Sequence, residues 1–280
     1  MNRTVPLLVS ALLCGCGSTT EEGATDAPAP AAAVVSVGDL PEGNLYRTSR
    51  STDFDAVCKE LEKVEIVYIG DSPASAAHHQ LELQILRKLR ASTKLDSIGL
   101  AVVPRPLQPV LDDYARARID WAQLGERLAP LDLTAYRSIL EFAQEHRLGL
   151  VALDVAAEVV TAVEQNGRTG LSPEQAPAAS DPVAGYAEFV AQVAAAGADV
   201  WKLRDDVLAD SVVRWMRASP RGAQLAVIAP RDRVANAWGM EERVRTRAGR
   251  THASVVLLDE PPAPAQFARS YADYIFVPGE

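Results

Sequence analysis

Short, nearly continuous apolar segments alternate along this chain with longer segments of helical periodicity. The apolar segments are Glu65–Gly70, Ser97–Val103, Gly149–Val155, Gln224–Ala229, Ser254–Asp259 and Tyr274–Val277. The helical patterns cover Ser75–Ala91, Gln108–Arg118, Ala135–Arg147, Ala156–Gln165, Tyr186–Ala195, Leu203–Arg217 and Val234–Ala248. Strands that are apolar on both faces require helices on both faces of their sheet. The sequence therefore predicts an α/β fold with a mostly parallel sheet flanked by helices, in which Tyr274–Val277 forms a last edge strand.

One part of the predicted domain differs in composition from this alternation. The stretch Ser172–Pro182 is rich in Ala, Pro and Ser, which is typical of a loop. We expect this loop and the two helices after it, about residues 172–220, to form a helical insertion or lid on the domain.

The first residues have the pattern of a targeting signal and are not expected to belong to the folded domain. Arg3 precedes a short apolar stretch, and Leu13–Cys14–Gly15–Cys16 resembles a bacterial lipobox. We expect residues 1–15 to be a lipoprotein signal peptide and Cys16 to carry the lipid. Cys14 is the alternative acceptor, and an ordinary cleaved signal is the alternative to the lipobox. Because no acidic residue follows Cys16, the pattern predicts a lipid-anchored protein of the cell envelope, at the outer membrane.

The domain organisation and the excluded partners follow from composition. Residues 16–43 are dominated by small residues, Pro and acids, and predict a flexible tether. The α/β domain is expected over residues 44–280. With 28 Lys and Arg against 37 Asp and Glu, the formal net charge is −9. A nucleic-acid partner is not expected, because phosphate contacts need clustered basic residues.

Charged residues gather where the predicted strands end. In open parallel sheets, ligands bind outside the carboxyl ends of the strands. The residues placed there are Asp71, Arg105, Asp154, Arg231, Asp232 and Arg233, with Asp259 and Glu260 after the fifth strand. The arginines could bind a carboxylate or phosphate, for which the guanidinium fork is suited. The alternative is that these groups pair with one another and cap helices.

His78 and His79 begin the helix after Asp71. Neighbouring helical residues point about 100° apart, so the two imidazoles are not expected to share a metal ion. No nucleophile motif, dinucleotide fingerprint or phosphate loop occurs, and Cys58 lies on an amphipathic helix as a small buried hydrophobe. We therefore predict no catalytic residues and no metal site, and include both histidines among the ligand-binding candidates.

Several motifs together resemble the ChaN-like haem-binding uptake family of the Tiki/TraB/EreA superfamily. They are Ile66–Asp71 with His78–His79–Gln80, Gly99–Leu100 with Pro104–Tyr114, Trp121, Tyr136, Phe142–His146, Val151–Val155, Leu225–Ala229 and Trp238–Gly239–Met240. The likeness runs from about Thr52 to Asp259, and Trp238 joins the binding candidates through it. The resemblance implies haem as a ligand, held in part by the helical insertion. Tyr186 is then the candidate axial ligand, and the alternative is that the aromatic residues of the insertion only pack the core.

Polar positions of the family pattern are altered in this chain. Asp71 stands where the pattern has Glu, Pro73 where it has His, and Ala101 where it has an acid. The last element, Pro230–Arg233, lacks both the Gly and the His of the pattern. An arginine cannot coordinate a metal ion, so the resemblance implies a degenerate, non-catalytic member. Its alternatives are a residual metal-dependent hydrolase and an envelope scaffold with a silent pocket, and a homodimer or another envelope protein is the expected protein partner.

Overall fold

The computed structural model describes residues 43–47, 50–92, 94–177, 179, 185–194, 197–260 and 271–278. The expected signal peptide, Cys16 and most of the expected tether lie outside these residues. Residues 40–280 form one compact unit. Among the described residues, no helix combines the length and the apolar character needed to cross a bilayer.

Eight strands form a single sheet in the order β2-β1-β8-β7-β3-β6-β4-β5. The strands are β1 (Gly43–Arg47), β2 (Arg50–Thr52), β3 (Ile66–Asp71), β4 (Leu95–Pro104), β5 (Gly149–Asp154), β6 (Gln224–Pro230), β7 (His252–Leu257) and β8 (Tyr274–Pro278). The six strands from β8 to β5 run parallel, and β1 pairs antiparallel with both β8 and β2. The predicted mostly parallel α/β fold is therefore confirmed. The edge position predicted for Tyr274–Val277 is wrong, because β1 covers the free side of β8.

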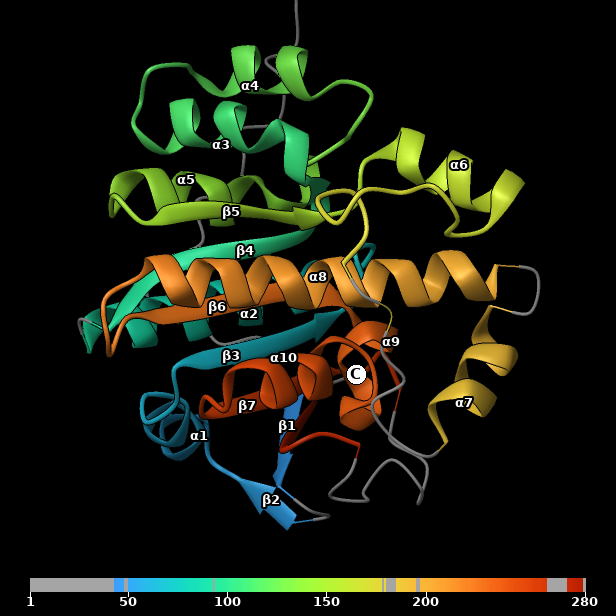
Figure 1. Ribbon diagram of the computed structural model, residues 1–280. Coiled ribbons are helices and arrows are strands. Elements are labelled where there is room, and N and C mark those ends of the chain that lie inside the picture. The colour runs from blue at the N-terminus through green and yellow to red at the C-terminus, as the bar shows by residue number, and fades with distance from the viewer. Residues whose placement is uncertain are drawn as a thin grey trace, which may run out of the picture. The chain divides into compact units, whose positions relative to one another are not determined.

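The helices occupy both faces of the sheet. They are α1 (Phe54–Leu61), α2 (Ala76–Ala91), α3 (Gln108–Ala115), α4 (Trp121–Leu128), α5 (Arg137–Glu145), α6 (Ala157–Asn166), α7 (Tyr186–Val193), α8 (Ala198–Ala218), α9 (Arg231–Val234) and α10 (Met240–Ala248). Short 3₁₀ turns η1 (Arg105–Leu107), η2 (Thr134–Tyr136) and η3 (Ala235–Ala237) join some of them. Figure 1 shows α8 and α10 in front of the strands and α2 behind them.

Alternate residues of each strand enter different cores, which explains the continuous apolar runs. In β3, Val67 and Ile69 pack with α1 to α5, whereas Ile66 and Tyr68 pack with α8 and α10. Successive side chains of a strand point to opposite faces, so both sets must be apolar when both faces are covered. All six residues of β3 are buried.

Residues 172–220, expected to form a helical insertion or lid, include a helix that packs into the main core. Helix α8 lies along the sheet, and its buried residues Leu208, Val212 and Val213 belong to the main core on that face. It is the long crossover helix that precedes β6 and not a detachable cover. Helix α7 does lie apart from the sheet and contacts α8 (Figure 1).

A tight turn brings two arginines to the end of β3. A Cβ atom on Gly70 would stand 3.0 Å from the Val234 Cβ and 3.2 Å from the Arg231 Cα, so only glycine lets α9 pack this closely. The helix predicted over Val234–Ala248 is broken here, because Asn236 and Ala237 have φ angles of 67° and 54°. The break turns the chain so that α10 begins at Met240.

Candidate functional site

The carboxyl ends of the parallel strands bring the predicted polar residues to one edge of the sheet. Asp71 at the end of β3 is in register with Pro230 of β6, and Asp154 at the end of β5 is in register with Pro104 of β4. The structure divides these residues into a buried acid–imidazole cluster beside β3 and a set of arginine–carboxylate pairs around α8.

The buried cluster consists of Asp71, His79 and Glu82. One ligand atom from each of the three lies within 4.8 Å of the other two, and all three residues are buried. His79 Nδ1 lies 3.0 Å from Glu82 Oε2, and Tyr136 donates its hydroxyl proton to Asp71 Oδ2 at 2.9 Å. Asp71 ends β3, whereas His79 and Glu82 are one helical turn apart on α2, which presents them on the same side.

Burial dominates the electrostatics of this cluster. It raises the pKa of Glu82 to about 8 and raises the pKa of Asp71, since charged carboxylates lose their water there. For His79, burial disfavours the charged form, but the hydrogen bond and charge of Glu82 outweigh it and raise the pKa. All three groups therefore hold protons more tightly than they would in water.

His78 faces a different environment from His79. Its Nδ1 accepts a hydrogen bond from the Ser72 backbone N–H at 3.0 Å, and its Nε2 lies 3.5 Å from Asp259 Oδ1. Burial lowers the pKa of His78, so its neutral form is favoured. The two adjacent imidazoles thus have separate partners, and only His79 belongs to the buried cluster.

The arginines expected to bind an anion are paired with acids of the same chain. Arg105 donates to Asp210 at 2.9 Å and also to Ser211 and the Val207 carbonyl, which ties η1, the turn after β4, to α8. Asp154 accepts from Arg204 at 2.8 Å, and burial raises the pKa of Asp154. Arg105 and Asp154 are therefore engaged in ion pairs within the chain, which is the alternative to anion binding that the sequence left open.

Among the residues predicted at the strand ends, Arg231 and Asp232 have partly exposed side chains and long ion-pair distances. Arg231 reaches Asp259 at 3.5 Å and Asp232 at 3.9 Å, and its side chain is 35% exposed. Arg233, by contrast, donates to Asp205 at 2.9 Å and lies over the Trp201 ring with its guanidinium carbon 3.6 Å from the ring centroid. Of the three strand-end arginines, Arg231 is the most accessible to an anion.

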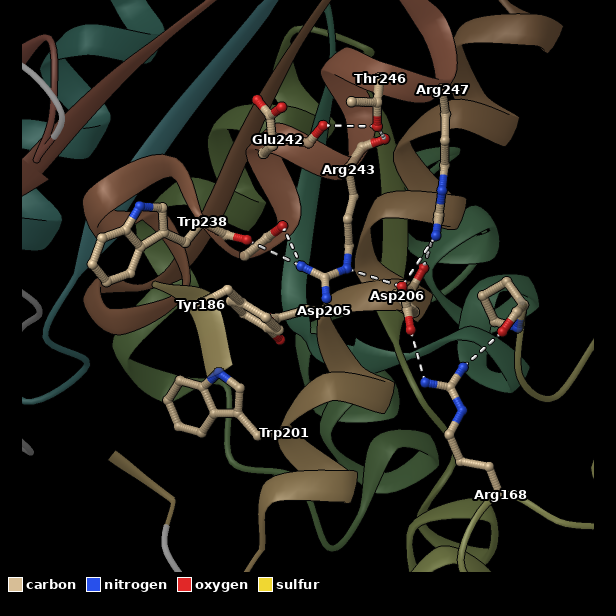
Figure 2. Close-up of polar contacts among 12 residues, drawn as sticks. Arg168, Tyr186, Trp201, Asp205, Asp206, Trp238, Glu242, Arg243, Thr246 and Arg247 are labelled. Carbon is tan, nitrogen blue, oxygen red and sulfur yellow. Dashed lines mark hydrogen bonds and ion pairs between the residues drawn. The ribbon is translucent and has the colours of Figure 1, made fainter. Parts of the chain in front are cut away.

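A buried ionic network links α8 to α10 (Figure 2). Asp206 accepts from Arg243 at 2.9 Å, from Arg168 at 2.7 Å and from Arg247 at 3.1 Å. Arg243 is fully buried and also donates to the backbone carbonyls of Trp238 and Gly239. This network fixes the turn that carries Trp238 against α8.

Tyr186, the candidate axial ligand named from sequence, belongs to this buried region. Its side chain is 0% exposed, its hydroxyl donates to Asp205 Oδ2 at 2.7 Å, and Arg243 lies 4.4 Å from its ring centroid. Burial and the neighbouring Asp205 carboxylate raise its pKa far above the ordinary value, which opposes formation of the phenolate. An iron ion could reach this oxygen only if the Asp205 bond were broken.

Three aromatic rings form a partly exposed face beside the network. Phe189 of α7 meets Trp201 and Trp238 edge to face, with ring centroids 6.2 and 5.4 Å away, and all three residues are partly exposed. Figure 2 shows the two indoles on the same side of the buried Tyr186. We call Phe189, Trp201 and Trp238 the aromatic face.

Sequence reasoning missed Glu82 and the carboxylates Asp205 and Asp206 as members of these clusters. The spacing of His79 and Glu82, three residues apart on a helix, was the available signal for the first. Nothing in the sequence pattern singles out Asp205 and Asp206 among the acids of α8, because their partners come from distant segments.

Comparisons with known proteins give a family and a fold. The description "Haem-binding uptake, Tiki superfamily, ChaN" matches residues 57–244, about two thirds of the chain. A structure of cofacial haem binding to ChaN of Campylobacter jejuni superposes with a TM-score of 0.69 at 12% identity, covering 85% of this chain and 98% of that one. The erythromycin esterase EreC, a mutant in its open conformation, gives a TM-score of 0.50 at 14% identity, covering 85% and 82%. No curated protein matches the sequence.

Proposed function

Because the chain belongs to the haem-binding uptake family ChaN of the Tiki superfamily, we propose that it is a non-catalytic haem-binding lipoprotein of the cell envelope. The observation that carries the haem assignment is the aromatic face. A porphyrin is a large flat π-system, and partly exposed indole and phenyl rings supply both apolar area and ring stacking to such a ligand. The family to which the chain belongs and the chemistry of this surface support the same ligand.

Arg231 offers a positive charge that suits an anionic ligand. Arg231 lies in α9, the segment directly before η3 and Trp238, and its two carboxylate partners are exposed and distant. A haem propionate could replace them, because a bidentate guanidinium–carboxylate pair is stronger than contacts at 3.5 Å and beyond. Bound haem would supply iron chemistry, whereas the chain's own residues bind and orient the ring.

The non-catalytic part of the proposal rests on the engaged strand-end groups. Arg233, at the last motif, is held by Asp205, and Pro73 contributes only its backbone carbonyl, as acceptor for His79. Neither can act as a general base or a metal ligand. The likeness to the erythromycin esterase EreC extends to the fold and does not transfer its activity.

Haem titration of the purified protein tests the ligand. We expect a shifted and sharpened Soret band in the wild type, and a weaker dissociation constant in Phe189→Leu and Trp238→Leu. Loss of one stacked ring corresponds to about a tenfold change in affinity. The matched control is Trp121→Leu, because Trp121 lies on α4, outside the aromatic face. An unchanged Soret spectrum in the wild type, or equal affinities in all three variants, would contradict the assignment.

The envelope location has its own test. Metabolic labelling with a fatty acid should mark the wild type and Cys14→Ser, and should be abolished in Cys16→Ser. Fractionation should then place the labelled wild type with the outer membrane. Labelling that survives Cys16→Ser, or a wild type found wholly in the soluble fraction, would contradict the anchor.

A further inference from the structure

We propose that Asp71, His79 and Glu82 bind one divalent transition-metal ion, with zinc the foremost candidate, as a structural site that joins β3 to α2. The ligands are His79 Nδ1 and one carboxylate oxygen each from Asp71 and Glu82. The site is independent of the haem proposal, since it uses neither the aromatic face nor Arg231. Of its three ligands, Asp71 stands at one of the family positions altered in this chain, whereas His79 and Glu82 do not.

The orientation of His79 is the first argument. Its Nε2 lies 3.0 Å from the Pro73 carbonyl oxygen, which can only accept, so Nε2 carries the proton. In the neutral ring the lone pair is therefore on Nδ1, which faces Glu82 at 3.0 Å. Metal-ligating histidines almost always donate their second N–H to a carbonyl or carboxylate in this way. Tyr136 further fixes the ring by edge contact, with centroids 4.9 Å apart.

Two carboxylate oxygens without partners are the second argument. Glu82 Oε1 and Asp71 Oδ1 are buried and accept no hydrogen bond from an N–H group or a hydroxyl, and their residues are 0% and 1% exposed. The two carboxyls are hydrogen-bonded to each other when one of them is protonated. Leaving buried acceptors unsatisfied costs about 1–3 kcal/mol each, and more for a charged group. Of the other two oxygens, Asp71 Oδ2 accepts from Tyr136, and Glu82 Oε2 faces His79 Nδ1, where a hydrogen bond forms only if one of the two groups carries a proton there. The free oxygens therefore belong to the same small cluster as the Nδ1 lone pair.

Charge balance is the third argument and selects the ligand class. Two ionised carboxylates and one neutral imidazole carry a charge of −2, which a divalent cation neutralises completely. A single proton shared by the two carboxyls removes only one of these two charges. One nitrogen and two oxygen ligands suit zinc and its neighbours in the first transition series, whereas calcium and magnesium prefer oxygen ligands alone. Because the ligand residues are at most 8% exposed, the ion would stabilise the fold and have little access to a substrate.

A similar histidine–glutamate pair elsewhere in the chain provides the control. His252 Nε2 lies 2.9 Å from Glu241 Oε1, and Glu241 is 5% exposed. Among the described residues, no second carboxylate joins this pair to form a group of three possible ligands, as Asp71, His79 and Glu82 do. Glu241→Gln therefore removes a buried glutamate bonded to histidine without touching the proposed site.

The experiment measures metal content and spectroscopy of the full-length protein in detergent, stripped with a chelator and reloaded with Zn²⁺ or Co²⁺ in the absence of haem. We expect about one equivalent of zinc per chain and visible d–d absorption bands of four- or five-coordinate Co²⁺. At a free Zn²⁺ concentration a hundredfold above the dissociation constant, the melting temperature should rise by about 5 °C or more. Glu82→Gln should lose the bands and the stoichiometric zinc, whereas Glu241→Gln should keep both.

Asp71→Asn is the second variant, for the case that Glu82→Gln does not fold. It keeps the Tyr136 contact through its amide oxygen and removes one negative charge, so zinc affinity should fall by tenfold or more. The proposal is overturned if the reloaded wild type holds no stoichiometric metal, which would make the cluster a proton-sharing structural pair. It is equally overturned if both site variants retain the cobalt bands of the wild type.

Discussion

Replacement of Asp206 by asparagine tests how far the buried ionic network stabilises the fold. Asp206 is 1% exposed in its side chain and accepts from Arg243, Arg168 and Arg247. Asparagine preserves the shape of the side chain and removes its charge. Arg243, which is 0% exposed, then remains as a buried cation facing a neutral amide.

The magnitude follows from the burial of the stranded charge. Removing one partner of a buried ion pair typically costs about 3–5 kcal/mol, because the remaining charge lacks both water and its counter-ion. Arg243 keeps two backbone carbonyl acceptors and its place against the Tyr186 ring, so the cost should lie at the lower end, about 3 kcal/mol. For a domain of this size, that corresponds to a fall of about 6–12 °C in melting temperature.

Urea unfolding followed by circular dichroism measures this loss, with Glu141→Gln as the control. Glu141 accepts from Arg137 at 2.7 Å, but the two side chains are 49% and 48% exposed. Exposed helix pairs of this kind contribute about 0.5 kcal/mol or less. The double variant Asp206→Asn with Arg243→Met should be more stable than additivity predicts, because the stranded charge is gone.

A loss in Asp206→Asn equal to that of Glu141→Gln would refute the reasoning. It would mean that the Asp206 carboxylate gains no more from its three arginines than an exposed carboxylate does from one. Strict additivity in the double variant would refute the stranded-charge explanation in particular.

Other outcomes follow from individual contacts. Burial raises the pKa of the Cys58 thiol from 9.0 to about 12, so its alkylation at pH 8, followed by mass spectrometry, should be about a thousandfold slower than that of an exposed cysteine; a rate within tenfold would contradict the burial. Burial raises the pKa of Asp154, so the folded state binds its proton more tightly and stability from this group falls as pH rises above the unfolded value of 3.8. Asp154→Asn should therefore show a smaller fall in unfolding free energy from pH 4 to pH 6 than the wild type, and an equal or steeper fall would contradict the sign. The Gln108 amide donates to the Leu150 carbonyl and accepts from the Ala152 N–H, both at 2.7 Å, which occupies the free edge of β5. Gln108→Leu should cost about 1–3 kcal/mol in urea unfolding, and unchanged stability would show that water replaces the amide fully.

The fold class was predictable because its signal is local. Each strand of the parallel sheet is a short apolar run, and the helices between strands keep helical periodicity, so α/β alternation is visible without long-range contacts. The position of Tyr274–Val277 was not predictable, because the covering strand β1 has the sequence GNLYR, which is not a continuous apolar run. The role of α8 was also missed, because its sequence pattern does not say which surface its apolar side covers.

For the candidate site, the sequence predicts where the charged residues lie but not which of them pair with one another. The sequence determined that Asp71, Arg105, Asp154 and the Arg231–Arg233 segment lie at one edge, since the carboxyl ends of parallel strands meet there. Only the tertiary structure decided which of these charges are neutralised. Arg105 is paired with an acid 105 positions away and Arg233 with one 28 positions away, and no sequence periodicity specifies such pairs. The packing of α2 and α8 against the strand ends made Asp71, His79 and Glu82 a cluster and buried Tyr186, because helix docking sets which side chains lose their water.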